Sequence, residues 1–450
     1  MSETATPTKS RLHAVRAAIE SGRLRPIRRM LLSLEPAEIA LLLDSLPPHE
    51  RELLWEAVDP DDEGEVLLHV AEEVRAGLIR GMDAEELVAA AGSMELDDLA
   101  DLIGDLPETV TQRVLHSLDQ QDRARLQRVL VYPEDTAGGL MNTDAVTVRP
   151  EVTVEVVRRY LRMHGDVPDK TDCLFVVNRY GKYLGTLFVT RLLTNEDDLT
   201  IGEVMETDPP GIPAETAAAE VARLFANRDL VSAPVVDGDG RLVGRITVDD
   251  VLDVISEQAE HSIMSMAGLD EEDDMFAPVA ASTRRRAVWL GINLATAFLA
   301  SWVVGLFEAT IEKVVALAIL MPIVASMGGI AGTQTLTLIV RGLALGQVEW
   351  SNARAILIKE IAVGALNGLL WALVVAAFAL LWFRDWRIGL IIGAAMVTNL
   401  LAAALSGVGI PLLLKRVGID PALAGGVVLT TITDCLGFMT LLGLGALFLK

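Results

Sequence analysis

The spacing of apolar residues changes twice along this chain, and each change indicates a different kind of structure. Between residues 10 and 130 the apolar positions recur at helical spacing. Between residues 140 and 256, short apolar runs alternate with glycine-containing polar turns and helical stretches. From residue 287 onward the apolar segments are long enough to cross a bilayer. The pattern predicts an all-helical part, an α/β part and a membrane part.

The helical part contains an internal repeat with a period of 60 residues. Its first copy contains Ile39, Leu42, Leu43, Leu46 and Pro47, and its second contains Leu99, Leu102, Ile103, Leu106 and Pro107. Repeats of this kind are typical of stacked helices, so we expect an all-α superhelical domain.

The α/β part holds two copies of one pattern. The runs LFVVNRYGKYLGTLFVTRLL and APVVDGDGRLVGRITVDDVLDVI each read as a strand, a polar turn with glycine, a strand and a helix. This order predicts a tandem βαββα repeat. Residues 251–275 then read as a helix running into an acidic stretch, which is either a connector that carries force or a plain spacer.

Five apolar segments follow Arg284-Arg285-Arg286, at about 287–306, 314–340, 355–383, 388–414 and 422–449. Each reaches the ~20 residues that a membrane-spanning helix needs. With the N-terminus in the cytoplasm, eight basic residues flank the segments inside and four outside. This asymmetry favours a cytoplasmic N-terminus, and five crossings then place the C-terminus outside.

The second segment, MPIVASMGGIAGTQTLTLIVRG, is rich in proline, glycine and hydroxyl groups. Pro322, Gly328, Gly329 and Gly332 predict backbone loosened around a cavity, close helix packing through small residues, or both at once. Amides at Asn293, Asn367 and Asn399 suit hydrogen bonds between helices.

The charge is distributed unevenly. From Arg284 onward there are 12 basic and 7 acidic residues, a net of +5, and since the total is −24 the preceding part has −29. Such acidity argues against a nucleic-acid partner and is compatible with cations or with solubility alone. Cys173 and Cys435 give no disulfide framework. There is no signal-peptide pattern, and no P-loop, nucleophile elbow or HExxH, so we expect no enzyme.

Asp434 is the only acid in the last apolar segment. An ionised carboxylate at membrane depth is costly and usually marks an ion pathway; the alternative is an Asp paired inside the helix bundle. Thr430, Thr431, Thr433 and Gly437 surround it in sequence and suit a wet lining. Mg²⁺ prefers oxygen ligands and keeps much of its water shell. All six histidines precede the membrane segments, which argues against a transition-metal site there.

A second acidic cluster lies in MELDDLADLIGDL. Asp97 and Asp101 are four residues apart and share a helix face, where like charges repel. Either a divalent cation relieves this repulsion or the face is simply solvated.

Each βαββα copy resembles a CBS module, and such modules pair to form a regulatory unit. In the second copy Gly244, Thr247 and Asp250 match the pattern whose Thr and Asp contact a nucleotide, which implies ATP or another adenine nucleotide. The first copy has Phe188 and Arg191 at the corresponding positions, so the resemblance favours the second copy over the first for any nucleotide site.

Taken together, the chain resembles the MgtE-type magnesium channels. The resemblance rests on LMPIVASMGGIAGTQTLTLIVRGLALG, GIDPAL and TTITDCLGF and on the order of the parts. It implies an acidic N-domain over 1–135, a CBS pair over 136–256 (about 136–200 and 201–256), a connecting plug-like helix and linker over 257–283, and a pore domain over 284–450. It also implies a homodimer with its pore on the dimer axis.

The resemblance carries over site residues position by position. It implies pore ligation by Asp434 and Thr430. The regulatory metal ligands that it implies are Glu65, Asp97, Asp101, Asp229, Asp249, Asp250, Asp253, Glu257, Glu260 and Asp420.

The chain also departs from the family pattern. Ile330 stands where the family has Asn in its glycine-rich run. His261 and Ser262 stand where acids are common, and Ala219 replaces an acid, with Glu220 following. Of all that the resemblance implies, the closure contacts between the connecting helix and the pore therefore have the least support from these residues.

The implied function is import of Mg²⁺ across the plasma (inner) membrane into the cytoplasm. Cytosolic Mg²⁺ bound to the N-domain and CBS carboxylates would close the pore by negative feedback. The residues leave two alternatives open: a CBS-regulated transporter of another divalent cation such as Mn²⁺ or Co²⁺, and a membrane-anchored sensor of a nucleotide or ion.

Overall fold

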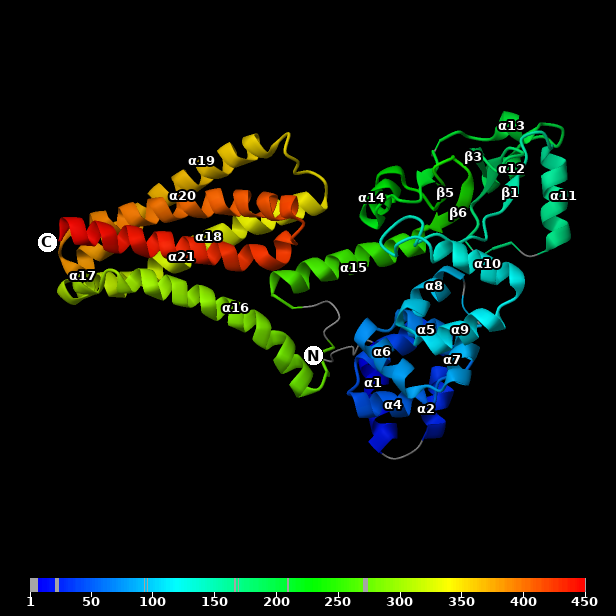
Figure 1. The fold of residues 1–450 in the computed structure, drawn as a ribbon, viewed down its shortest axis with the longest axis horizontal. Helices are drawn as coiled ribbons and strands as arrows, with labels where there is room; N and C mark the ends of the chain where they lie inside the picture. The colour runs from blue at the N-terminus through cyan, green and yellow to red at the C-terminus, as the bar shows by residue number, and fades with distance from the viewer. Residues whose placement is uncertain are drawn as a thin grey trace, which may run out of the picture. The chain divides into compact units, whose positions relative to one another are not determined.

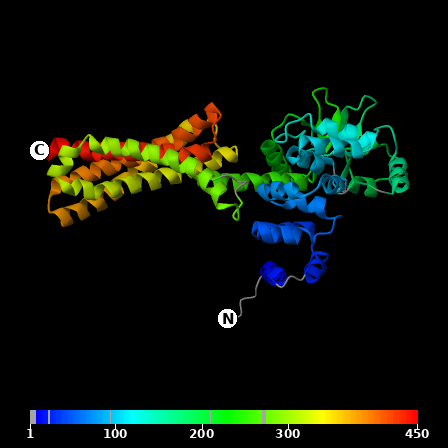
Figure 2. The same ribbon diagram turned by 60° about the horizontal axis from the view of Figure 1, so that its bottom comes forward.

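The structure, a computed structural model, describes residues 7–20, 24–92, 94, 96–165, 167–168, 170–208, 210–269 and 274–449. The chain divides into two compact units. One comprises Met1–Ala259 with Glu272–Ala277, and the other comprises Glu260–Glu271 with Pro278–Lys450. Each has hydrophobic clusters of its own. Figures 1 and 2 show the elements of both units.

The first unit begins with short helices that pack on one another, drawn in blue to cyan in Figure 1. The helices are α1 (Pro7–Glu20), α2 (Leu24–Leu31), α3 (Pro36–Asp44), α4 (Pro48–Trp55), α5 (Glu63–His69), α6 (Glu72–Gly81), α7 (Ala84–Ala91), α8 (Leu96–Asp105), α9 (Glu108–Ser117) and α10 (Gln120–Val129). The predicted all-α N-domain is thereby confirmed.

The 60-residue repeat corresponds to α3 and α8. Leu42 and Leu43 in the first copy and Leu99 and Leu102 in the second are buried in one core. The proline that closes each copy is the N-cap residue of the next helix. Proline has no backbone N–H to donate, so it separates two short helices at the same place in each copy.

Two three-stranded sheets form the α/β part, one in each βαββα copy. The first has the order β1 (Thr147–Val148), β2 (Cys173–Val177) and β3 (Tyr183–Phe188), and the second has β4 (Ile212–Pro213), β5 (Ser232–Val236) and β6 (Leu242–Thr247). In both sheets the first pair is parallel and the second antiparallel. The associated helices are α11 (Val154–His164), α12 (Val189–Thr194), α13 (Ile201–Val204) and α14 (Ala218–Arg228). The predicted tandem CBS-like pair is confirmed.

Helix α15 (Val248–Met266) continues without a break from the second copy into the connecting segment. Its first turn contains Asp249 and Asp250, and a turn with Gly268 at φ 69° follows its end. The acidic residues 270–273 lie outside the described part of the chain.

The second unit contains five helices long and apolar enough to cross a membrane, counted over the described residues. They are α16 (Val279–Gly305), α18 (Val315–Ala344), α19 (Ala353–Phe383), α20 (Trp386–Val417) and α21 (Pro421–Phe448), with the short α17 (Glu308–Lys313) after α16. Helix α20 is buried along most of its length and packs against α18, α19 and α21 (Figure 1). The five predicted segments are confirmed, and each helix extends beyond at least one expected end.

Helix α18 is continuous despite Pro322 and its glycines. A Cβ on Gly328 would lie 2.1 Å from Nδ2 of Asn399, and one on Gly332 would lie 2.9 Å from the Leu429 side chain. The glycines therefore let α20 and α21 approach closely, which is the packing role, and the helix continues through them without a break. Asn399 donates across the helices to the carbonyl of Val324 at 2.8 Å.

Candidate ion pathway and regulatory carboxylates

Helix α21 places the predicted pore residues. Asp420 begins it by accepting hydrogen bonds from the backbone N–H groups of Ala422 and Leu423, and Pro421 occupies the first turn. Thr430 and Asp434 lie one helical turn apart on this helix, so their side chains lie on one face. The N-cap fixes where α21 begins, and the four-residue spacing then places Thr430 and Asp434 on the same face of the helix.

The carboxylate of Asp434 is only partly buried. Within the described residues no hydrogen bond or ion pair compensates its charge. The alternative of an Asp paired inside the bundle is therefore not what the structure shows. A carboxylate without a protein partner in an apolar span is costly, and a passing cation is the partner that would offset this cost.

The threonine hydroxyls near Asp434 donate hydrogen bonds to backbone carbonyls of their own helix. Thr430 donates to the carbonyls of Gly426 and Val427 at 3.0 and 3.1 Å, and Thr431 donates to Val427 at 2.7 Å. Thr433 is fully buried and bonds to Leu429 and Thr430. Each donated proton leaves lone pairs on the oxygen, so a half-exposed hydroxyl such as that of Thr430 remains an acceptor for water or a cation.

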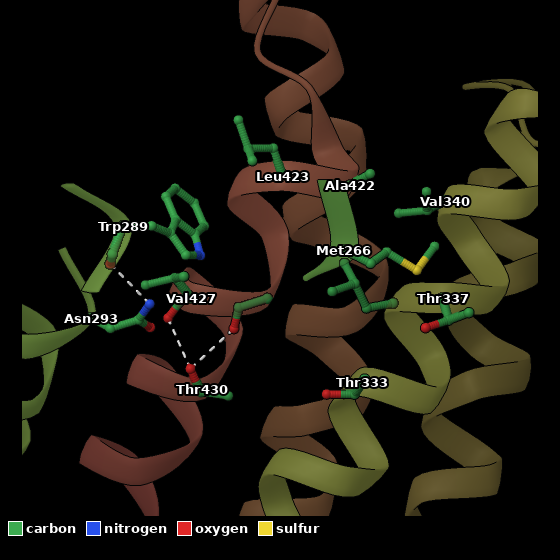
Figure 3. Close-up of a pocket in the computed structure, with 12 residues that line it drawn as sticks. Met266, Trp289, Asn293, Thr333, Thr337, Val340, Ala422, Leu423, Val427 and Thr430 are labelled. Carbon is green, nitrogen blue, oxygen red and sulfur yellow. Dashed lines mark hydrogen bonds between the residues drawn. The ribbon is translucent and has the colours of Figure 1, made fainter. Parts of the chain in front are cut away.

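A pocket of about 250 Å³ opens beside Thr430 (Figure 3). Its lining comes from the end of α15, from α16, from α18 and from α21. The lining residues are Met266, Trp289, Asn293, Thr333, Leu336, Thr337, Val340, Ala422, Leu423, Gly426, Val427 and Thr430. Hydroxyls from α18 and α21 thus face a common space within the second unit.

The end of α15 closes one side of this pocket. In Figure 3, Met266 lies beside Ala422 and points toward Thr337 and Val340 of α18. The following turn passes so near α16 that a Cβ on Gly268 would lie 1.9 Å from Nε1 of Trp289. Only glycine combines this approach with the left-handed backbone of that turn. His261, which stands where acids are common in the family, makes a direct contact here. Its Nε2 lies 3.4 Å from Oδ2 of Asp420.

Glu360 on α19 is a second acid of the membrane unit, and the sequence reading did not single it out. It is 4% exposed, and it accepts a hydrogen bond from Thr335 of α18 at 3.1 Å and one from Lys359 at 2.6 Å. The available signal was an acid inside the third apolar segment, where ionisable side chains are rare and functional.

The acidic cluster of the first unit centres on Asp101. Desolvation by the surrounding protein, together with the carboxylates of Glu134 and Asp98, raises the pKa of Asp101 to about 7, and Glu257 of α15 adds to this effect. Asp101 still has an exposed surface. The structure therefore brings two predicted regulatory residues, Asp101 and Glu257, into one electrostatic neighbourhood. The side chain of Asp97 lies outside the described part of the chain.

A second group of acids lies at the start of α15. Burial raises the pKa of Asp250 to about 6, although Thr247 donates to it from its backbone N–H at 2.9 Å. Burial of Asp249 opposes ionisation, but hydrogen bonds from Lys170 and Thr247 outweigh it and hold the pKa of Asp249 below its usual range. Burial raises the pKa of Asp253. These three acids form one cluster on a single helix.

The other predicted regulatory residues are more dispersed. Glu65, Asp229 and Glu260 are exposed, and Asp229 caps α14 in a left-handed conformation. Among the residues with described side chains, no three His, Cys, Asp or Glu residues are placed to hold one metal ion. In the first CBS-like copy, Arg191 forms an ion pair with Glu206 at 3.1 Å.

The raised pKa values predict a pH-dependent stability of the first unit. Between pH ~5 and ~7, where Asp101 and Asp250 titrate, the folded form binds more protons than the unfolded chain, so the free energy of unfolding should fall as pH rises. The raised pKa of Asp101 would nominally contribute ~4 kcal/mol to the free energy of unfolding at low pH, and solvent screening of this partly exposed side chain should reduce the contribution to about 1 kcal/mol. In the full-length protein without Mg²⁺, the midpoint temperature of thermal unfolding of the first unit should be higher at pH 5.5 than at pH 7.5. Asp101→Asn should narrow the difference and Asp122→Asn should not; an unchanged difference in the Asp101 variant would contradict this assignment.

Known families match the N-domain, both CBS-like copies and most of the membrane part of this chain. The description "MgtE intracellular N domain" matches residues 34–135, "CBS domain" matches 137–196 and 201–257, and "Divalent cation transporter" matches 321–444. The chain is 32% identical over 443 residues to the magnesium transporter MgtE of Thermus thermophilus, covering 97% of this chain and 98% of the relative. This chain belongs to the MgtE family of magnesium transporters. The magnesium transporter MgtE of Bacillus subtilis is 27% identical over 433 residues, covering 96% of each chain.

A solved structure also resembles the soluble half of this MgtE family member. It is the cytosolic domain of the Mg²⁺ channel MgtE in complex with ATP, which is 33% identical and covers 54% of this chain and 99% of its own, with a TM-score of 0.49. Family membership and the five apolar helices make the chain a membrane protein of the transporter class.

Proposed function

We propose that this MgtE family member is a homodimeric channel that admits Mg²⁺ into the cytoplasm and closes when cytosolic Mg²⁺ binds its soluble half. The observation that carries the proposal is the carboxylate of Asp434, which lies in an apolar helix without a compensating partner among the described residues. The family match names magnesium for the relatives and supports the choice of cargo.

The chemistry of the proposed pore suits a hydrated divalent cation. Mg²⁺ gives up its water reluctantly, so a pore should offer fixed negative charge and few direct ligands. Two copies of Asp434 across a two-fold axis would supply this charge, and Thr430 one turn away would accept hydrogen bonds from the ion's water shell. Cys435 points about 100° away from Asp434 around the helix and has a packing role.

The proposed orientation places the N-terminus in the cytoplasm and the C-terminus outside. It is supported by the basic residues at the cytoplasmic ends, including Lys415 and Arg416 in the last turn of α20, and by five spanning helices. A negative membrane potential inside the cell would then drive Mg²⁺ inward, by about 2.3 kcal/mol per unit charge for each 100 mV.

The proposed regulation rests on the acids of the first unit. Each subunit has a net charge of −29 before Arg284, so its domains repel at low cation concentration. Mg²⁺ bound near Asp101 and Glu257, and near the cluster of Asp249, Asp250 and Asp253, would relieve this repulsion. To act as a switch, Mg²⁺ must bind the compact closed state more tightly than the open state.

Replacing both Asp97 and Asp101 by alanine should weaken the feedback. Removal of two carboxylates lowers the charge that cytosolic Mg²⁺ neutralises, so conduction should persist at internal Mg²⁺ concentrations that shut the unaltered protein. Flux into liposomes at graded internal Mg²⁺ measures this, with Glu52→Ala, at an exposed position of α4 in the N-domain, as the matched control. Unchanged shut-off in the double variant would remove these residues from the sensor.

The overall proposal is tested by Mg²⁺ entry into liposomes that contain the purified full-length protein. Entry that is suppressed by Mg²⁺ on the side of the soluble half supports both the channel and the feedback. Faster entry of Mn²⁺ or Co²⁺ than of Mg²⁺ would assign the pathway to another divalent cation. No entry of any cation would favour a membrane-anchored sensor.

A nucleotide site in the second CBS-like copy is a further part of the proposal. At the junction of β6 and α15, the hydroxyl of Thr247 donates a hydrogen bond to Oδ2 of Asp250 at 3.0 Å. A ribose hydroxyl could replace the contact between them. Titration of the full-length protein with ATP, beside Asp250→Ala, tests this site.

A further inference from the structure

Glu360 is held in a manner opposite to Asp434, although both are acids in membrane-spanning helices. Oε2 of Glu360 accepts a hydrogen bond from Thr335 at 3.1 Å, and Oε1 accepts one from Lys359 at 2.6 Å. The Lys359 side chain is 61% exposed, whereas that of Glu360 is 6% exposed. The lysine therefore has its ammonium at the protein surface and balances a carboxylate that lies within the protein.

The hydrogen bond of Glu360 joins two helices that otherwise make few contacts. Thr335 lies on α18 and is 8% exposed, while Glu360 lies on α19. On its other side Thr335 packs against α20, where a Cβ on Gly407 would lie 2.8 Å from Cβ of Thr335. Thr335 is thus fixed between α19 and α20 by one polar and one steric contact.

The position of Thr335 on α18 determines what it can control. Successive residues of a helix are about 100° apart, so Thr333 and Thr337 share one face and Thr335 faces roughly the opposite way. Thr333 and Thr337 line the pocket beside Thr430 (Figure 3), whereas Thr335 is buried behind them. A rotation of α18 would move both pocket hydroxyls together.

We infer that Glu360 is a positioning residue for ion conduction. Through Thr335 it fixes the rotation of α18 and thereby aims the hydroxyls of Thr333 and Thr337 into the space beside the proposed pore helix. The choice of Mg²⁺ as the conducted ion rests on the proposed function, whereas the contacts of Glu360 and Thr335 do not depend on it. A carboxylate suits the role because it is an acceptor only, so Thr335 is oriented as the donor without ambiguity.

Thr335→Val tests the inference with little change in side-chain shape, and Thr335→Ser restores the hydroxyl. In liposomes with the full-length protein, Thr335→Val should raise the half-saturating Mg²⁺ concentration or change the Mg²⁺-to-Co²⁺ flux ratio by roughly tenfold, the effect of losing one hydrogen bond to a charged group. Thr335→Ser should recover most of it. Glu360→Gln should act in the same direction, and the double variant should be less than additive.

Controls separate positioning from general damage. Thr398→Val removes an exposed hydroxyl that bonds only to the Ala394 carbonyl of its own helix, so it should leave both quantities unchanged. Hydrogen exchange across residues 333–340 should increase in Thr335→Val and recover in Thr335→Ser. Wild-type half-saturation, flux ratio and exchange in Thr335→Val would overturn the inference, as would equal behaviour of the Val and Ser variants. Absence of flux in the unaltered protein would refute the proposed function instead, and the exchange measurement would still decide the role of Glu360.

Discussion

Asp434→Asn should abolish Mg²⁺ entry into liposomes, although the amide has nearly the same shape as the carboxylate. In the proposed pore this carboxylate is the fixed charge that offsets the cost of bringing a divalent cation into an apolar region. At an effective dielectric constant of ~20, losing that charge should raise the barrier by about 3 kcal/mol or more, a fall of over ~100-fold in flux. Asp434→Glu keeps the charge and should retain part of the flux.

The matched control lies on the same helix. Thr440 donates to the Leu436 carbonyl of α21 at 2.7 Å, and Thr440→Val removes that hydroxyl without altering any charge. We expect flux close to that of the unaltered protein. If Asp434→Asn conducts as well as Thr440→Val, the ion pathway does not pass Asp434.

Arg51→Ala should release the segment that precedes the first membrane helix. Arg51 forms a two-pronged ion pair with Asp274, at 2.9 and 3.2 Å, and both side chains are less than 8% exposed. Nε of Arg51 also donates to the Leu43 carbonyl at 2.9 Å. Breaking such a buried pair leaves an uncompensated carboxylate and should cost about 3–5 kcal/mol.

Hydrogen exchange of the full-length protein measures this loss locally. The backbone N–H of Asp274 donates to Glu73 at 2.9 Å, and that of Phe276 donates to Asp274 at 2.9 Å. Both amides should exchange at least ~100-fold faster in Arg51→Ala, since 3 kcal/mol corresponds to a factor of this size. Arg125→Ala breaks the partly exposed pair with Asp122 and should change stability by less than ~1 kcal/mol. Equal exchange in the two variants would show that the buried pair does not hold the segment.

The sequence predicted the features that depend on local pattern. The five membrane helices follow from hydropathy, because each segment must satisfy its own backbone hydrogen bonds in lipid. The burial of Leu42 and Leu102 follows from the 60-residue repeat. The position of Asp434 on a helix with Thr430 one turn before it follows from spacing alone.

Features that depend on a distant partner could not be predicted. The same glycine-rich run is compatible with a loosened helix or with close packing, and only the contacts of Gly328 with Asn399 and of Gly332 with Leu429 distinguish the two. The role of Glu360 depends on Thr335, which lies on another helix 25 residues earlier. The ion pair between Arg51 and Asp274 joins residues separated by 223 positions, and nothing in either local sequence indicates the other.

The separation of 223 positions between Arg51 and Asp274 affects the order in which the chain folds during synthesis. The N-terminal helices emerge from the ribosome first, but the carboxylate that neutralises Arg51 follows only after both CBS-like copies and α15 have been made. Until then the guanidinium has its backbone partner at Leu43 but no counter-charge, so the site around it must remain hydrated. The contacts around Arg51 are therefore completed only when synthesis arrives at the membrane helices.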